Sequence, residues 1–269
     1  MFRQLARLAD INLARNSLFA IPRGLFLGLD AARNLTLAGN ILSSLRRGVF
    51  FGLRNLERLD VSDNAITTVE PGSFESCRRL TALDLSNNRL RRIDVHSFRS
   101  LENLRRLSLA SNNLAAVEPG VFFSVRALVE LDLSSNNLTV VVPRQFSGSP
   151  RLERIDLAKN AIWNVSADAF DGLADLRSIY LDRNRVRTLD TCLVVGLGRQ
   201  VELSITGNPV TCSCDDGAWV VEAGAALTLV GECGEPAVRR GLPLARFNAT
   251  ACPSLHTDDR CRQLLSPAS

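Results

Sequence analysis

The chain has 269 residues, of which 46% are hydrophobic, and a formal net charge of +4. The hydrophobic content is ample for a buried core, and no run approaches the roughly 18 apolar residues of a membrane span. The positive charge is mild and shows no concentrated basic stripe, which excludes a nucleic-acid footprint and favours a solvated arginine-rich surface.

The first seven residues, 1–7, are interpreted as the end of a repeat unit that starts before residue 1. Phe2 and Leu5 fall where later units carry a phenylalanine and a second apolar residue. The 24-residue register therefore places the start of this first unit before residue 1. We expect Met1 to open a fragment or an incomplete gene model, with missing amino-terminal repeats and cap; a naturally uncapped protein is the alternative.

Residues 8–199 repeat one pattern eight times at a constant step of 24 residues. The pattern is clearest in Leu80-x-x-Leu83-x-Leu85-x-x-Asn88-x-Leu90. Apolar and polar residues alternate around Leu83, which predicts a short strand with its leucines facing a core. The asparagine carries donors and an acceptor on one side chain, so we expect it to satisfy buried backbone groups of the following turn. Nine asparagines occupy this place: Asn16, Asn40, Asn64, Asn88, Asn112, Asn136, Asn160, Asn184 and Asn208.

Three apolar columns complete the buried side, at places 14, 19 and 22 counted from the first leucine of the pattern. The column at place 14 is Ile21, Leu45, Val69, Ile93, Val117, Val141, Val165 and Leu189. The phenylalanine column at place 19 is Phe26, Phe50, Phe74, Phe98, Phe122, Phe146 and Phe170, closed by Val194. The column at place 22 is Leu29, Leu53, Cys77, Leu101, Val125, Leu173 and Leu197, interrupted by Ser149. No single unit can bury these side chains alone, so stacked units bury them against each other and form a solenoid.

The frame is that of the leucine-rich repeat. Its 24-residue step and phenylalanine column resemble the typical extracellular class of these repeats, found in Toll-like receptors, Slit-type guidance proteins and neuronal adhesion receptors. The resemblance covers essentially the whole chain. It implies an α/β solenoid shaped as a right-handed horseshoe, with a parallel β-sheet on the concave face and irregular or short helical segments on the convex face.

The third, fifth and eighth places of the strand frame point outward and would form the surface that a partner meets. Nine parallel strands about 4.8 Å apart give a face roughly 40 Å long, which is wide enough for a protein. Aspartates line its middle column, arginines flank them, and Tyr180 offers the one aromatic anchor. The alternative is that these are ordinary solvent-facing side chains of a repeat. We predict a ligand-binding region on the concave face, toward its carboxy-terminal end: Arg106, Asp132, Arg154, Asp156, Lys159, Tyr180 and Arg183.

Four triplets fit the acceptor pattern for N-linked glycans, at Asn34, Asn137, Asn164 and Asn248. Chance supplies single triplets freely, but four of them in a fold commonly displayed outside cells indicate the secretory pathway. A glycan at Asn34 would lie on the inner face and would push a partner toward Tyr180.

Residues 200–261 are predicted to form a ninth strand and a cap that seals the last unit. The cysteine pattern, together with Trp219, resembles the cysteine-rich carboxy-terminal cap of extracellular leucine-rich repeats. Four cysteines allow three connectivities; the resemblance implies the pairs Cys212–Cys233 and Cys214–Cys252. Disulfides imply an oxidising compartment, and the spacing differs from that of zinc sites, so we expect no metal.

Three cysteines remain. Cys77 falls in a core column and is predicted to be a buried thiol, while Cys192 lies in the last full repeat. Cys261 can pair with Cys192, bridge to a second chain or stay free, so a dimer remains open. The tail, residues 262–269, carries no lipid or membrane anchor, and we expect no direct membrane insertion in this segment.

Catalysis is not expected, because His96 and His256 lie in no nucleophile or metal motif and no glycine-rich phosphate loop occurs. No cofactor is expected either. The resemblance implies an extracellular protein-binding module, namely the ectodomain fragment of a cell-surface receptor or adhesion protein, anchored by a part missing here. The alternatives are a secreted guidance, matrix or decoy protein, or an innate-immune pattern-recognition ectodomain. The expected partner is a protein ligand, not a nucleic acid; the fold alone does not decide between these roles.

Overall fold

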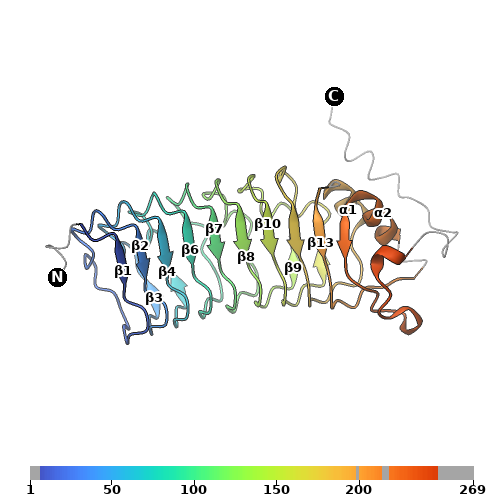
Figure 1. Cartoon of the computed structure of the whole chain (residues 1–269), viewed down its shortest axis with the longest axis horizontal. Helices are drawn as coiled ribbons and strands as arrows, with labels where there is room; N and C mark the ends of the chain where they lie inside the picture. The colour runs from blue at the N-terminus through green and yellow to red at the C-terminus, as the bar shows by residue number, and fades with distance from the viewer. Residues whose placement is uncertain (1–6, 198–199, 214–217, 248–269) are drawn as a thin grey trace, which may run out of the picture.

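The protein is an elongated solenoid of stacked coils. Its structure, a computed structural model, describes residues 7–197, 200–213 and 218–247. The coils run from β1 (Asp10–Asn12) at the amino-terminal end to the helices α1 (Thr191–Leu197) and α2 (Ala218–Ala226) at the other end (Figure 1).

One parallel sheet follows the whole solenoid. Within the described residues it has ten strands in the order β1-β2-β4-β6-β7-β8-β10-β12-β13-β14. Its pairs from β1 to β13 join residues 24 apart, as in Leu83 beside Leu107, so each coil repeats the place of the one before. The strands after β1 are β2 (Asn34–Thr36), β4 (Arg58–Asp60), β6 (Ala82–Asp84), β7 (Arg106–Ser108), β8 (Glu130–Asp132), β10 (Arg154–Asp156), β12 (Ser178–Tyr180), β13 (Glu202–Ser204) and β14 (Thr228–Val230).

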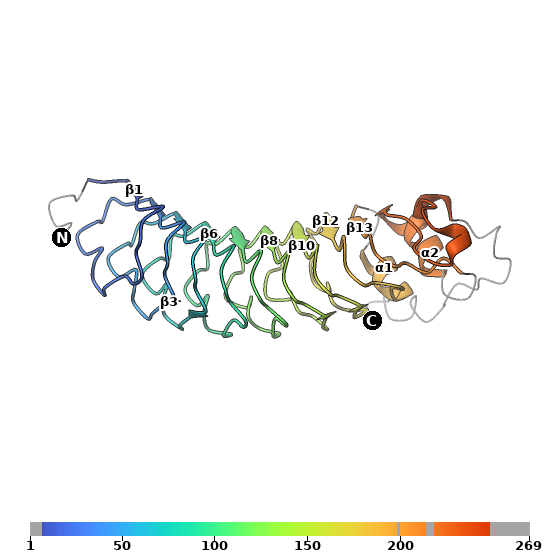
Figure 2. The ribbon, with the colours of Figure 1, turned by 90° about the horizontal axis from the view of Figure 1, so that it is seen from below.

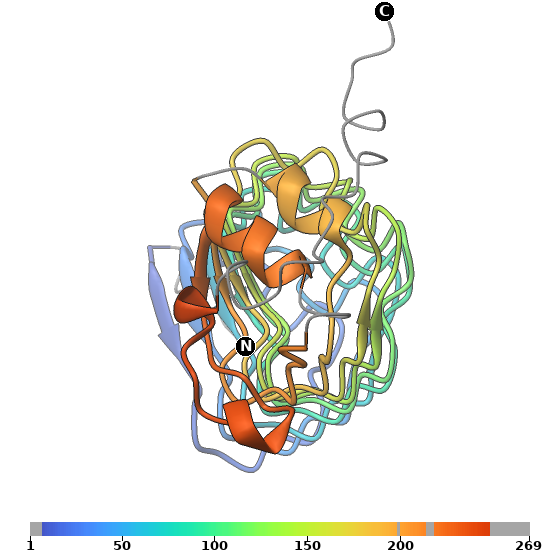
Figure 3. The ribbon, with the colours of Figure 1, turned by 90° about the vertical axis from the view of Figure 1, so that its right-hand side faces the viewer.

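The far side of the coils is built mainly of turns. Two short parallel pairs lie there, β3 (Ser44–Leu45) with β5 (Thr68–Val69), and β9 (Val140–Val141) with β11 (Asn164–Val165). The view along the solenoid shows the coils superimposed, with the long sheet on one side and the turns on the other (Figure 3). The predicted solenoid with a parallel sheet and few helices is therefore confirmed.

Phenylalanine rings form a spine through the core, as predicted. All seven are buried, and the rings stack in the series Phe26–Phe50–Phe74 and Phe122–Phe146–Phe170 with centroids 5.7–6.3 Å apart. Val194 of α1 is buried and closes the column. Ser149, which interrupts the neighbouring column, is buried too, and its hydroxyl lies 3.3 Å and 3.2 Å from the carbonyl oxygens of Phe122 and Val125.

The asparagine column connects one coil to the next. The Asn112 amide donates to the carbonyl oxygens of Leu109 and Ala110 in its own coil and of Leu85 in the coil before, at 3.0–3.2 Å. Its Oδ1 accepts the backbone N–H of Leu90, also in the preceding coil, at 3.0 Å. Its counterparts from Asn40 to Asn208 make the equivalent contacts, so the side chain satisfies buried backbone groups of two coils at once.

The cap covers the last coil with α2, β14 and two short 3₁₀ turns, η1 (Ala237–Arg239) and η2 (Leu244–Arg246). Sequence patterns predict nine strands; the tenth, β14, extends the sheet because the cap's own backbone pairs with the exposed edge of β13. Trp219 of α2 is 2% exposed and Val210 is fully buried. Figure 2 shows the cap against the end of the coils.

One expected cap disulfide is present, between Cys212 and Cys233. Cys192 is also disulfide-bonded. The expected Cys214–Cys252 pair and Cys261 lie outside the described residues, and the domain boundaries at 7/8, 199/200 and 261/262 stay predictions. Across the described ranges, no helix combines the length and apolar character needed to cross a membrane.

Candidate protein-binding face

The exposed face of the long sheet forms a groove of about 780 Å³. Seven consecutive strands of the sheet, β1, β2, β4, β6, β7, β8 and β10, supply its lining. Each of these seven strands is three residues long, and its middle residue is buried. The residues on either side of it therefore face the groove, and the 24-residue register aligns them in columns across the coils.

The column at the carboxy end of the strands is acidic. Asp60, Asp84, Asp132 and Asp156 line the groove there, with Ser108 between the second and the third. Each carboxylate accepts the backbone N–H of the residue two places on, at 2.8–3.0 Å. This local bond fixes the carboxylate's orientation, so the groove presents a preorganised acidic centre line.

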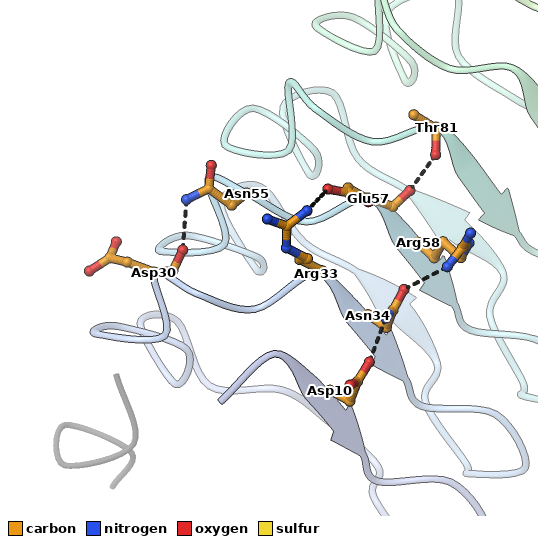
Figure 4. A network of polar contacts seen from close by, with 8 residues as sticks. All are labelled: Asp10, Asp30, Arg33, Asn34, Asn55, Glu57, Arg58 and Thr81. Atoms are coloured by element: carbon orange, nitrogen blue, oxygen red, sulfur yellow. Dashed lines mark hydrogen bonds and ion pairs between the residues drawn. The ribbon is translucent and has the colours of Figure 1, made fainter. Parts of the chain in front are cut away.

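Arginines flank this line at the amino end of the strands. Arg106 Nε lies 3.2 Å from Glu130 Oε2 on the next strand, but both side chains are well exposed, so the pair contributes little to stability. Arg154 places its guanidinium 5.5 Å from the ring centre of Tyr180, a cation–π contact. Arg58 donates to Asn34 Oδ1 at 3.4 Å (Figure 4).

Figure 4 also shows how neighbouring coils are tied together beside the groove. Arg33 pairs with Glu57 at 2.7 Å, and the Thr81 hydroxyl donates to the Glu57 carbonyl oxygen at 3.0 Å. Asn55 donates to the carbonyl oxygen of Asp30 at 2.7 Å. Each of these contacts joins residues 24 or 25 apart and so connects one coil to the next.

The surroundings of Asp156 disfavour the charged form of its carboxyl group. Burial raises the pKa of its carboxyl, and the nearby Asp132 and Asp182 raise it further, against the lowering effects of the Ala158 N–H and Arg154. A cationic group of a ligand would relieve this repulsion, so the carboxylate is a favourable place for a ligand contact.

Asp156→Asn is therefore expected to stabilise the free protein at pH 7. The folded-state pKa lies above that of the unfolded chain, so the ordinary Asp156 makes stability fall as the pH rises through the raised value. The amide removes this loss and keeps an oxygen for the Ala158 N–H. Urea unfolding should give the variant the higher midpoint at pH 7, with the difference shrinking below about pH 4; a lower midpoint at pH 7 would contradict the account.

Five of the seven predicted contact residues lie on the sheet face, and the other two lie in turns beside it. Arg106, Asp132, Arg154 and Asp156 line the groove. Tyr180 lies on the next strand, against Arg154, and so extends the same face beyond the groove lining. Lys159 and Arg183 are exposed in the turns that follow β10 and β12. The role of all seven residues in binding stays a prediction.

Lys159 and Arg183 belong to the column at the eighth place, whose outward position was predicted from the sequence but whose backbone conformation was not. Both have left-handed backbones, with φ of 55° and 54°. Gly39 and Gly207 at the same place have φ of 66° and 72°. The same conformation occurs at the other members of the eighth place: Arg15, Asp63, Asn87, Ser111 and Ser135. The turn repeats this conformation coil after coil and so places the eighth residue of each coil equivalently beside the face.

The groove extends beyond the predicted contact region. The groove continues over the amino-terminal strands, where Asp10, Asn34, Arg58, Asp60 and Asp84 line it. The signal was present, since these residues occupy the same outward columns. The preference for the carboxy-terminal end came from Tyr180 and from the sequon at Asn34.

Three of the four predicted glycan acceptors lie in the described residues. Asn34 lies in the groove, where it donates to Asp10 and accepts from Arg58 (Figure 4). Asn137 and Asn164 are exposed on the outer flank of the coils. Asn248 lies outside the described residues. Of these three described acceptors, Asn34 is the one whose glycan would lie within the groove.

The described part of the chain was expected to hold a buried thiol at Cys77 and no metal site. Cys77 is buried, and burial raises the pKa of its thiol to about 12, so it stays protonated and unreactive. No group of three or more His, Cys, Asp and Glu side chains suited to a metal ion occurs among the described residues. His96 is exposed.

The repeated coil has counterparts among known proteins. A family model described as leucine rich repeat matches residues 31–90, 78–138, 102–162, 126–186 and 150–210. No curated protein matches the sequence.

Three solved structures resemble the whole coil stack. Human trophoblast glycoprotein, also called 5T4 or Wnt-activated inhibitory factor 1, is 25% identical, with a TM-score of 0.73 over 92% of this chain and 95% of that chain. The Drosophila Toll–Spatzle complex is 18% identical, with a TM-score of 0.66 over 93% of this chain and 46% of that chain. A leucine-rich repeat protein of Leptospira interrogans is 24% identical, with a TM-score of 0.70 over 86% and 57%. The last two likenesses show the fold alone.

Proposed function

Because the chain belongs to the leucine-rich repeat family, we propose that it is an extracellular protein-binding module that takes a protein ligand on its concave face. The observation that carries this proposal is the groove of about 780 Å³ along seven strands. Folds of this kind typically serve as interaction modules, which favours binding over catalysis and requires no cofactor.

The dimensions of the face suit a protein partner. Ten parallel strands at about 4.8 Å each extend over roughly 43 Å. A typical stable interface covers about 800 Å² on each partner, so a partner of that kind covers the strands together with the turns beside them. Because the asparagine contacts tie each coil to the next, the face is preorganised, and binding orders little additional chain.

The charge pattern favours a ligand that presents basic groups to the centre line and acidic groups to its flank. Asp132 and Asp156 form the centre, and Arg106 and Arg154 the flank. Such complementarity acts more on the association rate and on specificity than on raw affinity. We therefore expect binding to weaken as the salt concentration rises.

The extracellular setting is supported by three features. A disulfide joins Cys212 and Cys233, which fits an oxidising compartment. Asn137 and Asn164 lie exposed within N-x-S/T triplets. The similar human protein is itself named a glycoprotein. We propose that the chain is the ectodomain fragment of a cell-surface receptor or adhesion protein; a secreted form uses the same face.

Paired substitutions test the binding face. Arg154→Ala with Tyr180→Ala removes the arginine–aromatic contact of the concave face. Phe123→Ala with Arg126→Ala removes a contact of the same kind, also 5.5 Å long, on the opposite side of the coils. Each variant and the unchanged protein are applied to an array of purified secreted and cell-surface protein domains.

The concave pair is expected to weaken binding to a captured domain at least tenfold, since aromatic and arginine anchors dominate interface energetics. The convex pair should leave affinity unchanged. Equal affinity for all three proteins would refute the concave assignment, and so would a loss confined to the convex pair.

A further inference from the structure

Trp163 is a large aromatic side chain left open to solvent. It is 60% exposed and lies outside the groove, on the outer flank of its coil. The chain's other tryptophan, Trp219, is 2% exposed. An indole exposed in this way offers a broad apolar face on which another group can pack.

The backbone around Trp163 is aligned with that of the preceding coil. The backbone N–H of Trp163 donates to the Thr139 carbonyl oxygen at 3.0 Å, and the backbone N–H of Ala161 donates to the Leu138 carbonyl oxygen at 2.8 Å. The register of β9 and β11, which pairs Val140 with Asn164, continues this alignment. Trp163 therefore lies beside Thr139, and Ala161 lies beside Asn137.

Asn137 and Thr139 are the first and third residues of a sequon, and both are exposed while Leu138 between them is buried. Their side chains thus emerge on the same outer surface as Trp163. Residues that are diagonal neighbours on adjacent strands lie about 8 Å apart, within reach of long or aromatic side chains. Ala161, which lies beside Asn137 in the same coil as Trp163, has a small side chain and so leaves the space between Asn137 and Trp163 open.

We propose that Asn137 carries an N-linked glycan and that its first N-acetylglucosamine packs its apolar face on the Trp163 indole. The inference rests on the extracellular role proposed above, because the secretory pathway supplies the donor, a lipid-linked oligosaccharide. Asn137 Nδ2 loses one proton and bonds to the anomeric carbon of the sugar, while the bond from that carbon to the lipid pyrophosphate breaks; the pyrophosphate leaves with the electron pair.

The neighbouring sequon provides an internal control. Asn164 is exposed too, but it directly follows Trp163 in the chain. Successive side chains of an extended segment diverge, so a glycan on Asn164 projects away from the indole. Arg187, which occupies the place of Trp163 in the next coil, is paired with Glu235. The Asn137 glycan is therefore the occupant that the register favours.

The test begins with the full chain, fused to a secretion signal, expressed in cultured cells and analysed by peptide mass spectrometry. We expect Asn137 to be modified. Trp163 fluorescence is then quenched with acrylamide, since buried Trp219 responds little. Relative to Asn137→Gln, the glycosylated protein should show about a twofold lower quenching constant. Asn164→Gln should leave the constant unchanged, as should trimming to a single sugar with an endoglycosidase.

Equal quenching with and without the Asn137 glycan would overturn the inference, as would an unmodified Asn137 in a protein that is modified at Asn164. In both cases the proposed function survives. Absence of modification at every sequon in a chain that fails to be secreted would overturn the inference and the extracellular role together. A protein partner on Trp163 instead predicts loss of binding in Trp163→Ala with quenching independent of the glycan.

Discussion

Phe122→Ala is expected to lower the free energy of unfolding by about 3–5 kcal/mol, the range for deleting a buried aromatic ring. Phe122 is 1% exposed, and its ring stacks on that of Phe146 with centroids 6.0 Å apart. The ring packs in two coils, because it is buried in the core of its own coil and stacks on the ring of the next coil. Its loss should leave a cavity in the middle of the spine, where turns on both sides hold the backbone apart.

The adjacent residue provides a matched control for this prediction. Phe123 is 62% exposed and its ring lies against the exposed Arg126 guanidinium, so Phe123→Ala should cost less than about 1 kcal/mol. Denaturant unfolding of both variants, followed by far-UV circular dichroism, measures the difference. Equal losses for Phe122→Ala and Phe123→Ala would show that the phenylalanine spine does not hold the coils together.

Asn112→Ala is expected to cost about 3 kcal/mol. The substitution leaves three carbonyl oxygens, those of Leu85, Leu109 and Ala110, and the N–H of Leu90 without the amide partner. An unsatisfied buried polar group costs about 1–3 kcal/mol, and water that enters the space left by the amide can satisfy some of these groups.

Asn113→Ala is the control, because Asn113 is the same residue type one place later, and is exposed. Its midpoint of urea unfolding should match that of the unchanged protein within experimental error. If Asn112→Ala unfolded at the same urea concentration as Asn113→Ala, the amide would contribute no net stability to the connection between coils.

These two side chains show why the fold could be predicted from the sequence. A coil cannot bury Phe122 or satisfy Asn112 without its neighbours, so the same residue type must return at the same step. The 24-residue period therefore follows from the packing and fixes the strand register, as in the pairing of Leu83 with Leu107.

The shape of the face was less predictable. The eighth place adopts a left-handed backbone in residues as different as Arg183, Lys159 and Ser135, so residue type alone gives little sign of it. Gly39 and Asn87, which tolerate that conformation, were the available signal. The sequence identified the outward columns but not which of their members line one groove, because that depends on how the coils stack in space.

Cross-linking from the floor of the groove tests the central claim most directly. A photoreactive benzoylphenylalanine replaces Ser108, in the middle of the face on β7, or Ser147, which is exposed on the turns of the far side. Each protein is irradiated with a domain captured from the array. The account predicts a cross-linked product from position 108 and none from position 147; a product from position 147 alone would contradict it.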